Sequence, residues 1–453
     1  MKSITVGSKS VNLLALICAA MLAGCGGGGD DYHGGPGGGP ADRPFMLTVT
    51  VSGLTGSGLV LQDLGGDDLV IAGNGRATFS TRLRRNDDYA VSVARAPLSP
   101  TQACAVGNPI GTVRASDIDD VTVVCRSVTR AAYVANFNDN TISQFTVGGD
   151  GRLLPLASIA AAGSPAAIAV DPSGRYAYVV NVNNGTVSQY AIADSGRLSA
   201  LSPPAVVVGF NPVDIRIDAS GQRVYVANSA SNNISQLTIG PGGNLFPMTT
   251  PLANAGATPV SVALDPLGEF AYAANLNGNN ISQFGVESSG NLVPLSVATT
   301  AAGISPTSVV LHPSGRYAYV ANFGGNNLSQ YTVAANGRLT PFASATVLAG
   351  IGPSSITLDP SQRFAYVANG GSNTISQYAI NSDGSLAPRG VGGVATGGTP
   401  KRVAIDPTGS WLYAANSGSA DVSQYVIGAG GALAPLTPPT AAAGAAPNGI
   451  AIR

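Results

Sequence analysis

Ionisable side chains are scarce in this sequence of 453 residues, of which 10% are charged. The chain has 23 basic and 24 acidic residues, and a net charge of −1 gives no indication of nucleic acid or an anionic membrane surface as a partner. Histidine occurs only at His33 and His312, and glutamate only at Glu269 and Glu287. These shortages leave few side chains for acid–base catalysis or metal coordination. We therefore expect no metal, no cofactor and no nucleic-acid partner.

Helical periodicity is also lacking along the whole chain. Glycine is abundant, with 59 residues, and short apolar runs alternate with clusters of Gly, Asn, Ser and Asp. This composition is typical of many short strands joined by tight turns. The sequence therefore predicts an all-β protein.

The N-terminus has the features of a targeting segment, which we assign to residues 1–24. Lys2 and Lys9 precede an apolar run over residues 11–23 that is too short to span a bilayer as a helix. The run ends in Leu22-Ala23-Gly24-Cys25, which resembles the bacterial lipobox, where the cysteine is lipidated after cleavage. The alternative is an ordinary secretory signal that happens to contain a cysteine.

A lipid anchor at Cys25 implies a location in the cell envelope, with the membrane as a partner. In bacterial lipoproteins, which this segment resembles, aspartate directly after the lipidated cysteine is associated with retention in the inner membrane. Gly26 occupies that position here. We therefore expect the outer membrane, with the protein on its periplasmic or surface face. Residues 25–44 are glycine-rich and are expected to form a flexible tether. We expect the anchored protein to be a monomer.

Residues 45–126 are predicted to form a small β-sandwich. Short alternating runs such as MLTVTVSG and YAVSVAR are separated by turn residues. Of the four cysteines, Cys18 lies in the signal and Cys25 is the expected lipidation site. Cys104 and Cys125 remain, and they can pair in an oxidising compartment. No chemistry is evident in this region, which we interpret as a stalk or adaptor.

The rest of the chain, residues 130–453, is built from repeats of about 47 residues. Each repeat has four strand-like stretches, here called A (AIAVD), B (YAYVAN), C (TISQYTV) and D (LTPLAS). The leading tyrosines of the B stretches are Tyr133, Tyr178, Tyr225, Tyr272, Tyr319, Tyr366 and Tyr413. Seven such units predict a seven-bladed β-propeller.

The phase of the repeat predicts how the ring closes. The first unit begins with a B stretch at residues 131–136, and the last ends with a lone A stretch at residues 448–453. The C-terminal stretch is therefore expected to complete the first blade and to remove two open sheet edges.

Two further repeated features are expected to be structural. The Ser-Gln pairs of the C stretches, from Ser143-Gln144 onward, should hydrogen-bond between strands or blades. The Asp-Pro-x-Gly segments should form turns between A and B stretches, with His312 replacing the aspartate in one of them.

The A stretches break the repeat, and that is where we expect a site. One column of positions contains Ala167, Asp214, Ser261, Ser308, Ser355, Arg402 and Gly449. The column two residues later contains Ala169, Arg216, Ala263, Val310, Thr357, Ala404 and Ala451. Charged residues in a mostly apolar strand need a partner or water. Asp214, Arg216 and Arg402 are the catalytic candidates, expected at the channel mouth and solvated if no ligand is bound there.

The loops that follow the B and D stretches are rich in neutral amides and hydroxyls. They could hydrogen-bond a sugar or peptide, although Asn and Gly also simply form tight turns. The ligand-binding candidates from the channel mouth and these loops are Lys401, Ser261, Ser308, Ser355, Asn279 and Asn326.

The repeat resembles the YVTN-type propellers and, more broadly, the lactonase family that includes 6-phosphogluconolactonase-like proteins. The matching motifs include Tyr225-Val226-Ala227-Asn228, Tyr319-Val320-Ala321-Asn322, the DPSGR or HPSGR turns and the G-x-L-x-P segments. The resemblance implies a propeller fold and lactone chemistry supported by His, Glu and Arg around one channel mouth. This sequence departs from that pattern, since His312 lies in a turn on the opposite face.

Two functional hypotheses follow. The first is a non-catalytic binding or scaffold module on the cell envelope, which recognises a protein, a peptide or a glycan. The second is a lactone hydrolase of the 6-phosphogluconolactonase-like type, in which Asp214 serves as base. A dense ionisable cluster at one mouth would favour the enzyme, and an amide-lined mouth would favour binding.

Overall fold

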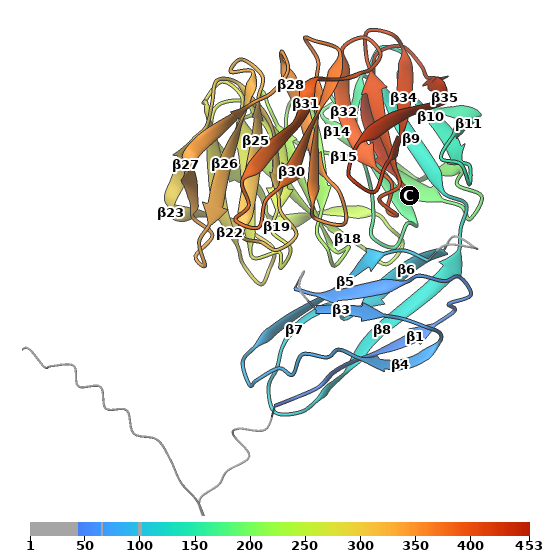
Figure 1. Ribbon diagram of the computed structural model, residues 1–453, viewed down its shortest axis with the longest axis vertical. Coiled ribbons are helices and arrows are strands. Elements are labelled where there is room, and N and C mark those ends of the chain that lie inside the picture. The colour runs from blue at the N-terminus through green and yellow to red at the C-terminus, as the bar shows by residue number, and fades with distance from the viewer. Residues whose placement is uncertain (1–43, 65–66, 98–101) are drawn as a thin grey trace, which may run out of the picture. The chain divides into compact units, whose positions relative to one another are not determined.

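The computed structural model describes residues 44–64, 67–97 and 102–453. These residues form 36 strands and contain no helix (Figure 1). The signal segment, Cys25 and nearly all of the expected tether lie outside the described residues. The fold class expected from the sequence is confirmed: an all-β chain with a seven-bladed propeller that follows a small two-sheet domain.

The small domain consists of two four-stranded sheets, with strand orders β4-β1-β8-β6 and β3-β2-β5-β7. Its strands are β1 (Leu47–Ser52), β2 (Val60–Asp63), β3 (Asp67–Val70), β4 (Gly75–Thr78), β5 (Asp88–Arg95), β6 (Gln102–Gly107), β7 (Ile110–Thr112) and β8 (Ile118–Ser127). Alternate residues of both sheets, such as Val49 and Val91, form one buried core. The sequence pattern did not reveal β6 and β7.

The expected disulfide between Cys104 and Cys125 is confirmed. The two cysteines are direct partners in the antiparallel pair β6 and β8, and their Cα atoms lie 4.0 Å apart. The bond therefore links two neighbouring strands of one sheet, at the edge of the domain core.

The propeller contains seven four-stranded antiparallel sheets. The A strands are β36 (Pro447–Ile452) in blade 1, then β12 (Pro165–Val170), β16 (Pro212–Ile217), β20 (Pro259–Leu264), β24 (Pro306–Leu311), β28 (Pro353–Leu358) and β32 (Pro400–Ile405) in blades 2 to 7. The B strands of blades 1 to 7 are β9 (Ala131–Asn136), β13 (Tyr176–Asn181), β17 (Arg223–Asn228), β21 (Phe270–Asn275), β25 (Tyr317–Asn322), β29 (Phe364–Asn369) and β33 (Trp411–Asn416).

The C and D strands form the outer half of each blade. The C strands are β10 (Thr141–Val147), β14 (Thr186–Ile192), β18 (Asn233–Ile239), β22 (Asn280–Val286), β26 (Asn327–Val333), β30 (Thr374–Ile380) and β34 (Asp421–Ile427). The D strands are β11 (Leu153–Ala160), β15 (Leu198–Val207), β19 (Leu245–Asn254), β23 (Leu292–Ala301), β27 (Leu339–Leu348), β31 (Leu386–Ala395) and β35 (Leu433–Ala442).

Neighbouring blades are joined by hydrogen bonds that recur around the ring. The leading tyrosine of each B strand is buried, and its hydroxyl donates to a glycine carbonyl in the next blade, as Tyr225 does to Gly290 at 2.7 Å. Burial raises the pKa of Tyr225 to about 12, so the hydroxyl stays a donor. The glutamines act similarly, because Gln236 Oε1 accepts from the backbone of Leu292 in the next blade. Ser235 instead accepts from Asn228 on the neighbouring strand of its own blade. The expectation that the Ser-Gln pairs hydrogen-bond between strands or blades is therefore confirmed.

The ring closes as the phase of the repeat predicted. Strand β36 pairs with β9, with Ile450 opposite Val134, and the backbone N–H of Arg453 donates to Ala131. The C-terminus consequently lies beside β9 (Figure 1). Blade 1 thus combines strands from the two ends of the repeat region.

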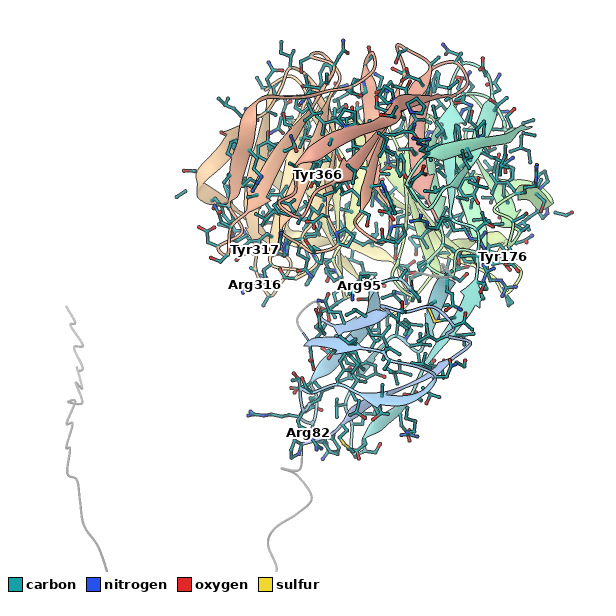
Figure 2. The ribbon with its side chains drawn as sticks, turned by 45° about the vertical axis from the view of Figure 1, so that its right-hand side comes forward. Arg82, Arg95, Tyr176, Arg316, Tyr317 and Tyr366 are labelled. Carbon is teal, nitrogen blue, oxygen red and sulfur yellow. A yellow bond between two sulfur atoms is a disulfide. The ribbon has the colours of Figure 1, made fainter. Side chains whose placement is uncertain are left out.

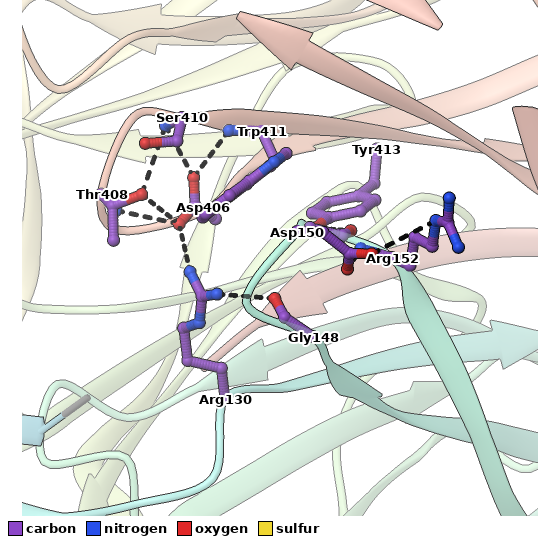
Figure 3. A network of polar contacts seen from close by, with 10 residues as sticks. Arg130, Gly148, Asp150, Arg152, Asp406, Thr408, Ser410, Trp411 and Tyr413 are labelled. Carbon is purple, nitrogen blue, oxygen red and sulfur yellow. Dashed lines mark hydrogen bonds and ion pairs between the residues drawn. The ribbon is translucent and has the colours of Figure 1, made fainter. Parts of the chain in front are cut away.

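A polar cluster reinforces this seam (Figure 3). Arg130, just before β9, is buried, and its Nη1 lies 3.5 Å from Oδ2 of Asp406 in blade 7. Its Nη2 donates to the carbonyl of Gly148 at 2.7 Å, and its guanidinium lies 4.5 Å from the centre of the Trp411 ring. The guanidinium therefore connects the first blade to the last.

The turns between A and B strands are built around an aspartate, as the Asp-Pro-x-Gly segments indicated. Asp406 accepts hydrogen bonds from the Thr408 hydroxyl and from the backbone N–H groups of Ser410 and Trp411. His312 takes this role in blade 5, where its Nδ1 contacts Ser314 at 2.8 Å. The histidine is thus a turn residue, as the sequence indicated.

Candidate functional site

The A strands line the central channel, because each contacts the A strands of both neighbouring blades. A cavity of about 410 Å³ lies between them. Its polar lining comes from Arg216, Ser355, Thr357 and Arg402, and these two arginines are its only ionisable residues. A second cavity of about 300 Å³ shares Arg216 with the first, so this residue contributes to both.

Small side chains account for this empty space. In the column that contains Arg216, four of the other six residues are alanines. Strands from seven blades meet around one axis here, and side chains of that size do not reach across it. The cavity therefore exists because the A strands carry alanine at these positions.

Asp214 is at the centre of the charged group, but it is fully buried. Its Oδ1 accepts a hydrogen bond of 2.7 Å from Arg402 Nη1, and its Oδ2 accepts one of 3.0 Å from the backbone of Val262. Arg216 Nη2 lies 3.8 Å from the same Oδ2. The expectation that these residues form a solvated cluster is wrong for Asp214, because the arginines and the neighbouring strand enclose the carboxylate.

The pair between Asp214 and Arg402 crosses the ring from β16 in blade 3 to β32 in blade 7. In the two intervening blades the same column holds Gly449 and Ala167, the two smallest residues in it. A Cβ at Gly449 would come within 2.8 Å of the Cα of Ala167, so these two small residues allow β36 and β12 to pack closely side by side. The ion pair itself joins two positions of this column that are far apart in the sequence.

Electrostatics keep Asp214 ionised. Burial raises the pKa of Asp214, but Arg216, Arg402 and the hydrogen bonds outweigh burial and hold that pKa below its ordinary value. A carboxylate with a lowered pKa and both oxygens engaged is a poor proton acceptor. Asp214 therefore holds the arginines in place and does not line the cavity as a base.

The arginines retain hydrogen-bonding capacity toward the cavity. Arg216 Nε donates to the Val262 carbonyl at 3.0 Å, and Arg402 is held through Nη1 alone. Nε and Nη2 of Arg402 have no hydrogen-bond partner among the described residues. Two cations share one carboxylate, so the group carries a net positive charge. The arrangement is suited to an anion or to a polarised carbonyl oxygen.

The serine candidates have a structural role. Ser261 accepts a hydrogen bond from Val309 in the next blade at 3.2 Å, and Ser308 accepts one from Ile356 at 3.4 Å. Ser355 does the same for Val403 at 3.5 Å and also lines the cavity. Asp214 makes the equivalent contact to Val262, so it occupies a position where other blades use serine.

The remaining candidates do not join the cavity. Asn279 and Asn326 have positive φ angles, and their side-chain oxygens accept hydrogen bonds from the backbones of Ser305 and Gly352. They are turn residues whose side-chain oxygens are already engaged with the backbone. Lys401 is exposed and lines neither cavity.

Sequence reasoning missed Thr357 as a site residue, although it lies in the same column as Arg216. The sequence could have indicated Thr357, because it is a hydroxyl-bearing residue in a column of mostly Ala and Val. Elsewhere in the described part of the chain, no group of three His, Cys, Asp or Glu side chains could hold a metal ion. That same part contains no helix able to cross a membrane.

Comparisons with known proteins agree with the propeller fold. The sequence matches the family described as Lactonase, 7-bladed beta-propeller, over residues 131–445. No curated protein sequence matches the chain.

Solved structures share the propeller fold at low sequence identity. A candidate 6-phosphogluconolactonase from Bacteroides uniformis is 22% identical, with a TM-score of 0.64, and the match covers 72% of this chain and 99% of that one. The periplasmic gluconolactonase of Pseudomonas aeruginosa is 19% identical, with a TM-score of 0.61 and coverages of 71% and 98%. Hydrazine synthase of Kuenenia stuttgartiensis is 20% identical, with a TM-score of 0.52 and coverages of 65% and 91%.

Proposed function

Because the chain belongs to the lactonase family of seven-bladed β-propellers, we propose that it binds a lactone in the channel cavity and hydrolyses it. The observation that carries the proposal is the pair of arginines, Arg216 and Arg402, which share one buried carboxylate and line an otherwise uncharged cavity. Family membership supports lactone chemistry, and the geometry supplies the groups that would recognise it.

The arginines would act on the lactone carbonyl. A guanidinium N–H that donates to the carbonyl oxygen makes the carbon more electrophilic and stabilises the oxyanion after attack by hydroxide. The ring C–O bond then breaks, and the released alkoxide takes the proton of the new carboxyl group, so that a hydroxy carboxylate is formed. Its carboxylate would pair with the same arginines.

The source of the nucleophile follows from what lines the cavity. Neither Asp, Glu nor His is among the lining residues, and Asp214 is held as an ion pair. Attack by hydroxide is then the available route. We expect kcat/KM to rise roughly tenfold per pH unit between about pH 6 and 8, without a bell shape.

A direct assay would follow acid release from a panel of γ- and δ-lactones at constant pH. We expect hydrolysis above the spontaneous rate, and a loss of roughly 100-fold in kcat/KM for Arg216→Gln. That variant keeps the 2.7 Å contact between Asp214 and Arg402, so the fold should be preserved, which circular dichroism would check. A folded parent protein without turnover of any lactone would contradict the proposal.

A second candidate is binding without turnover, which is favoured by the lack of a lining base. It places the ligand in the same cavity and not on the asparagine-rich loops, whose Asn279 and Asn326 are engaged with the backbone. Calorimetric binding of a carboxylate together with zero lactone turnover would favour this candidate over the enzyme.

The location of the protein remains our sequence-based proposal. Lipidation of Cys25 would attach it to the cell envelope, with the outer membrane as the expected site. A Cys25→Ser variant should no longer partition into the detergent phase. Retention of this variant in salt-washed membranes would contradict the anchor.

A further inference from the structure

We infer that the channel cavity selects a lactone or carboxylate with an apolar substituent over a polyhydroxylated sugar acid. This inference rests on the lactone chemistry proposed above and narrows it to a substrate class. It is carried by the lining of the cavity, most of which is aliphatic.

The A strands surround the channel with branched aliphatic residues next to the arginines. One column of positions carries an aliphatic residue in every blade, and all seven residues are partly exposed. Six of them line one or both cavities: Val170, Ile217, Leu264, Leu311, Ile405 and Ile452. The seventh is Leu358 of β28. We refer to these seven residues as the aliphatic ring.

The polar groups of this lining are few and come from blades 3, 6 and 7. Arg216 lies one residue before Ile217 of the aliphatic ring, and Arg402 lies three residues before Ile405. Ser355 is already engaged with the Val403 backbone, so Thr357 is the hydroxyl with the least commitment. The lining thus combines two cations with a mostly aliphatic surface, which suits a ligand that has an anionic group and an apolar body.

A sugar lactone would fit this surface poorly. Each of its hydroxyl groups loses water on entry and needs a partner, and an unpaired buried hydroxyl weakens binding roughly tenfold or more. The lining offers two guanidiniums and two hydroxyls, and the aliphatic ring offers no hydrogen bond. An alkyl or aryl substituent would instead bury apolar surface against the ring. A volume of about 410 Å³ is within the usual range for small-molecule sites, roughly 300–1,000 Å³.

The test compares two carboxylates, octanoate and gluconate, by isothermal titration calorimetry on the full chain. We expect octanoate to bind at least about tenfold more tightly, in a manner that Arg216→Gln weakens. Val310→Thr places a hydroxyl of similar shape in the cavity lining and should reduce the preference for octanoate several-fold. The matched control is Val293→Thr on the exposed surface of β23, which should change neither affinity.

The outcomes separate this inference from the proposed function. Gluconate binding as tightly as octanoate, or neither carboxylate binding, would overturn the inference. A parallel assay compares δ-octalactone with δ-gluconolactone. Turnover of gluconolactone alone would overturn the inference but leave the enzyme. Preferred binding of octanoate with no turnover of either lactone would keep the inference and reject the hydrolase.

Discussion

The B and C strands of the blades repeat closely, whereas the channel-lining A strands vary, and the two regions face different surroundings. Every B strand has the same neighbour to pack against, so one solution, such as Tyr225 donating to Gly290, serves in each blade. The A strands instead surround a single shared space. A residue that faces this space does not meet the same partner in every blade. Asp214 and Arg402 therefore occur once each in their column. Repetition therefore marks the interfaces between blades, and departure from repetition marks the site.

The largest expected effect on stability comes from removing β36, an A strand that closes the ring by pairing with the B strand β9. Deletion of residues 447–453 takes away the A strand of blade 1 and exposes the edge of β9. We expect aggregation, or a melting temperature lower by more than roughly 10 °C. Ile450→Asp tests the same strand without truncation, and Leu252→Asp on the exposed surface of β19 is its control. A truncated protein that melts like the parent would refute closure by β36.

The second prediction concerns the ion pair of the channel. Arg402→Ser leaves the buried Asp214 carboxylate with only the more distant Arg216, and we expect a loss of roughly 3 kcal/mol in the free energy of unfolding. Asp214→Ser combined with Arg402→Ser restores the residue that three other blades have in this column. That double variant should unfold within about 1 kcal/mol of the parent, or be more stable, yet lose carboxylate binding. Equal destabilisation by the single and double variants in urea would show that the pair is structural.

The third prediction concerns a repeated residue. Tyr272→Phe removes the hydroxyl that donates to Gly337 at 2.6 Å and leaves a buried carbonyl unpaired. We expect a loss of about 1–3 kcal/mol with no change in ligand affinity. The control is Tyr317→Phe. Tyr317 is partly exposed beside Arg316 (Figure 2), and its hydroxyl has no hydrogen-bond partner among the described residues. Similar losses for both variants would argue against the role of the blade-to-blade bond.

The smallest effect is expected in the turn of blade 4. In the turns of blades 2, 3, 6 and 7 a hydroxyl donates to the aspartate, but Asp265 has Leu267 at that place. Burial, together with the nearby Glu269, raises the pKa of Asp265 to about 6. The folded protein then binds the proton more tightly than the unfolded chain. Stability should therefore fall as the pH rises from about 4 to about 6.

Leu267→Ser would supply the missing hydroxyl. We expect it to lower the pKa of Asp265 and to raise the free energy of unfolding at pH 7 by about 1 kcal/mol. The gain should shrink toward pH 4, where Asp265 of the parent protein is protonated and stable. Urea unfolding at several pH values would measure this, and a gain independent of pH would point to a cause other than Asp265.

The sequence predicted the propeller because periodicity is a local property that can be counted. The spacing of tyrosines such as Tyr178 and Tyr225 predicts the blades, and the phase of the repeat predicts that β36 pairs with β9. The columns also identified Asp214, Arg216 and Arg402 as one group. They could not show that Asp214 is enclosed, because its burial depends on contacts with Arg402 and Val262, which lie on other strands. Strands β6 and β7 were missed because they lie outside the repeat, where no period indicates strands.

The pairing of β36 with β9 also sets an order of events during synthesis. Strand β9 is made early, but its partner emerges from the ribosome only after the six intervening A strands. Gly444 of the segment before β36 donates to Ser143 of β10, which lies 301 positions earlier. The first blade must therefore wait with one edge unpaired while the others form, and such an edge can pair with other chains. A nascent chain that stalls before β36 would keep this edge exposed and would be a target for chaperones or proteases. Only a chain whose last strand has paired has a complete ring and no such edge.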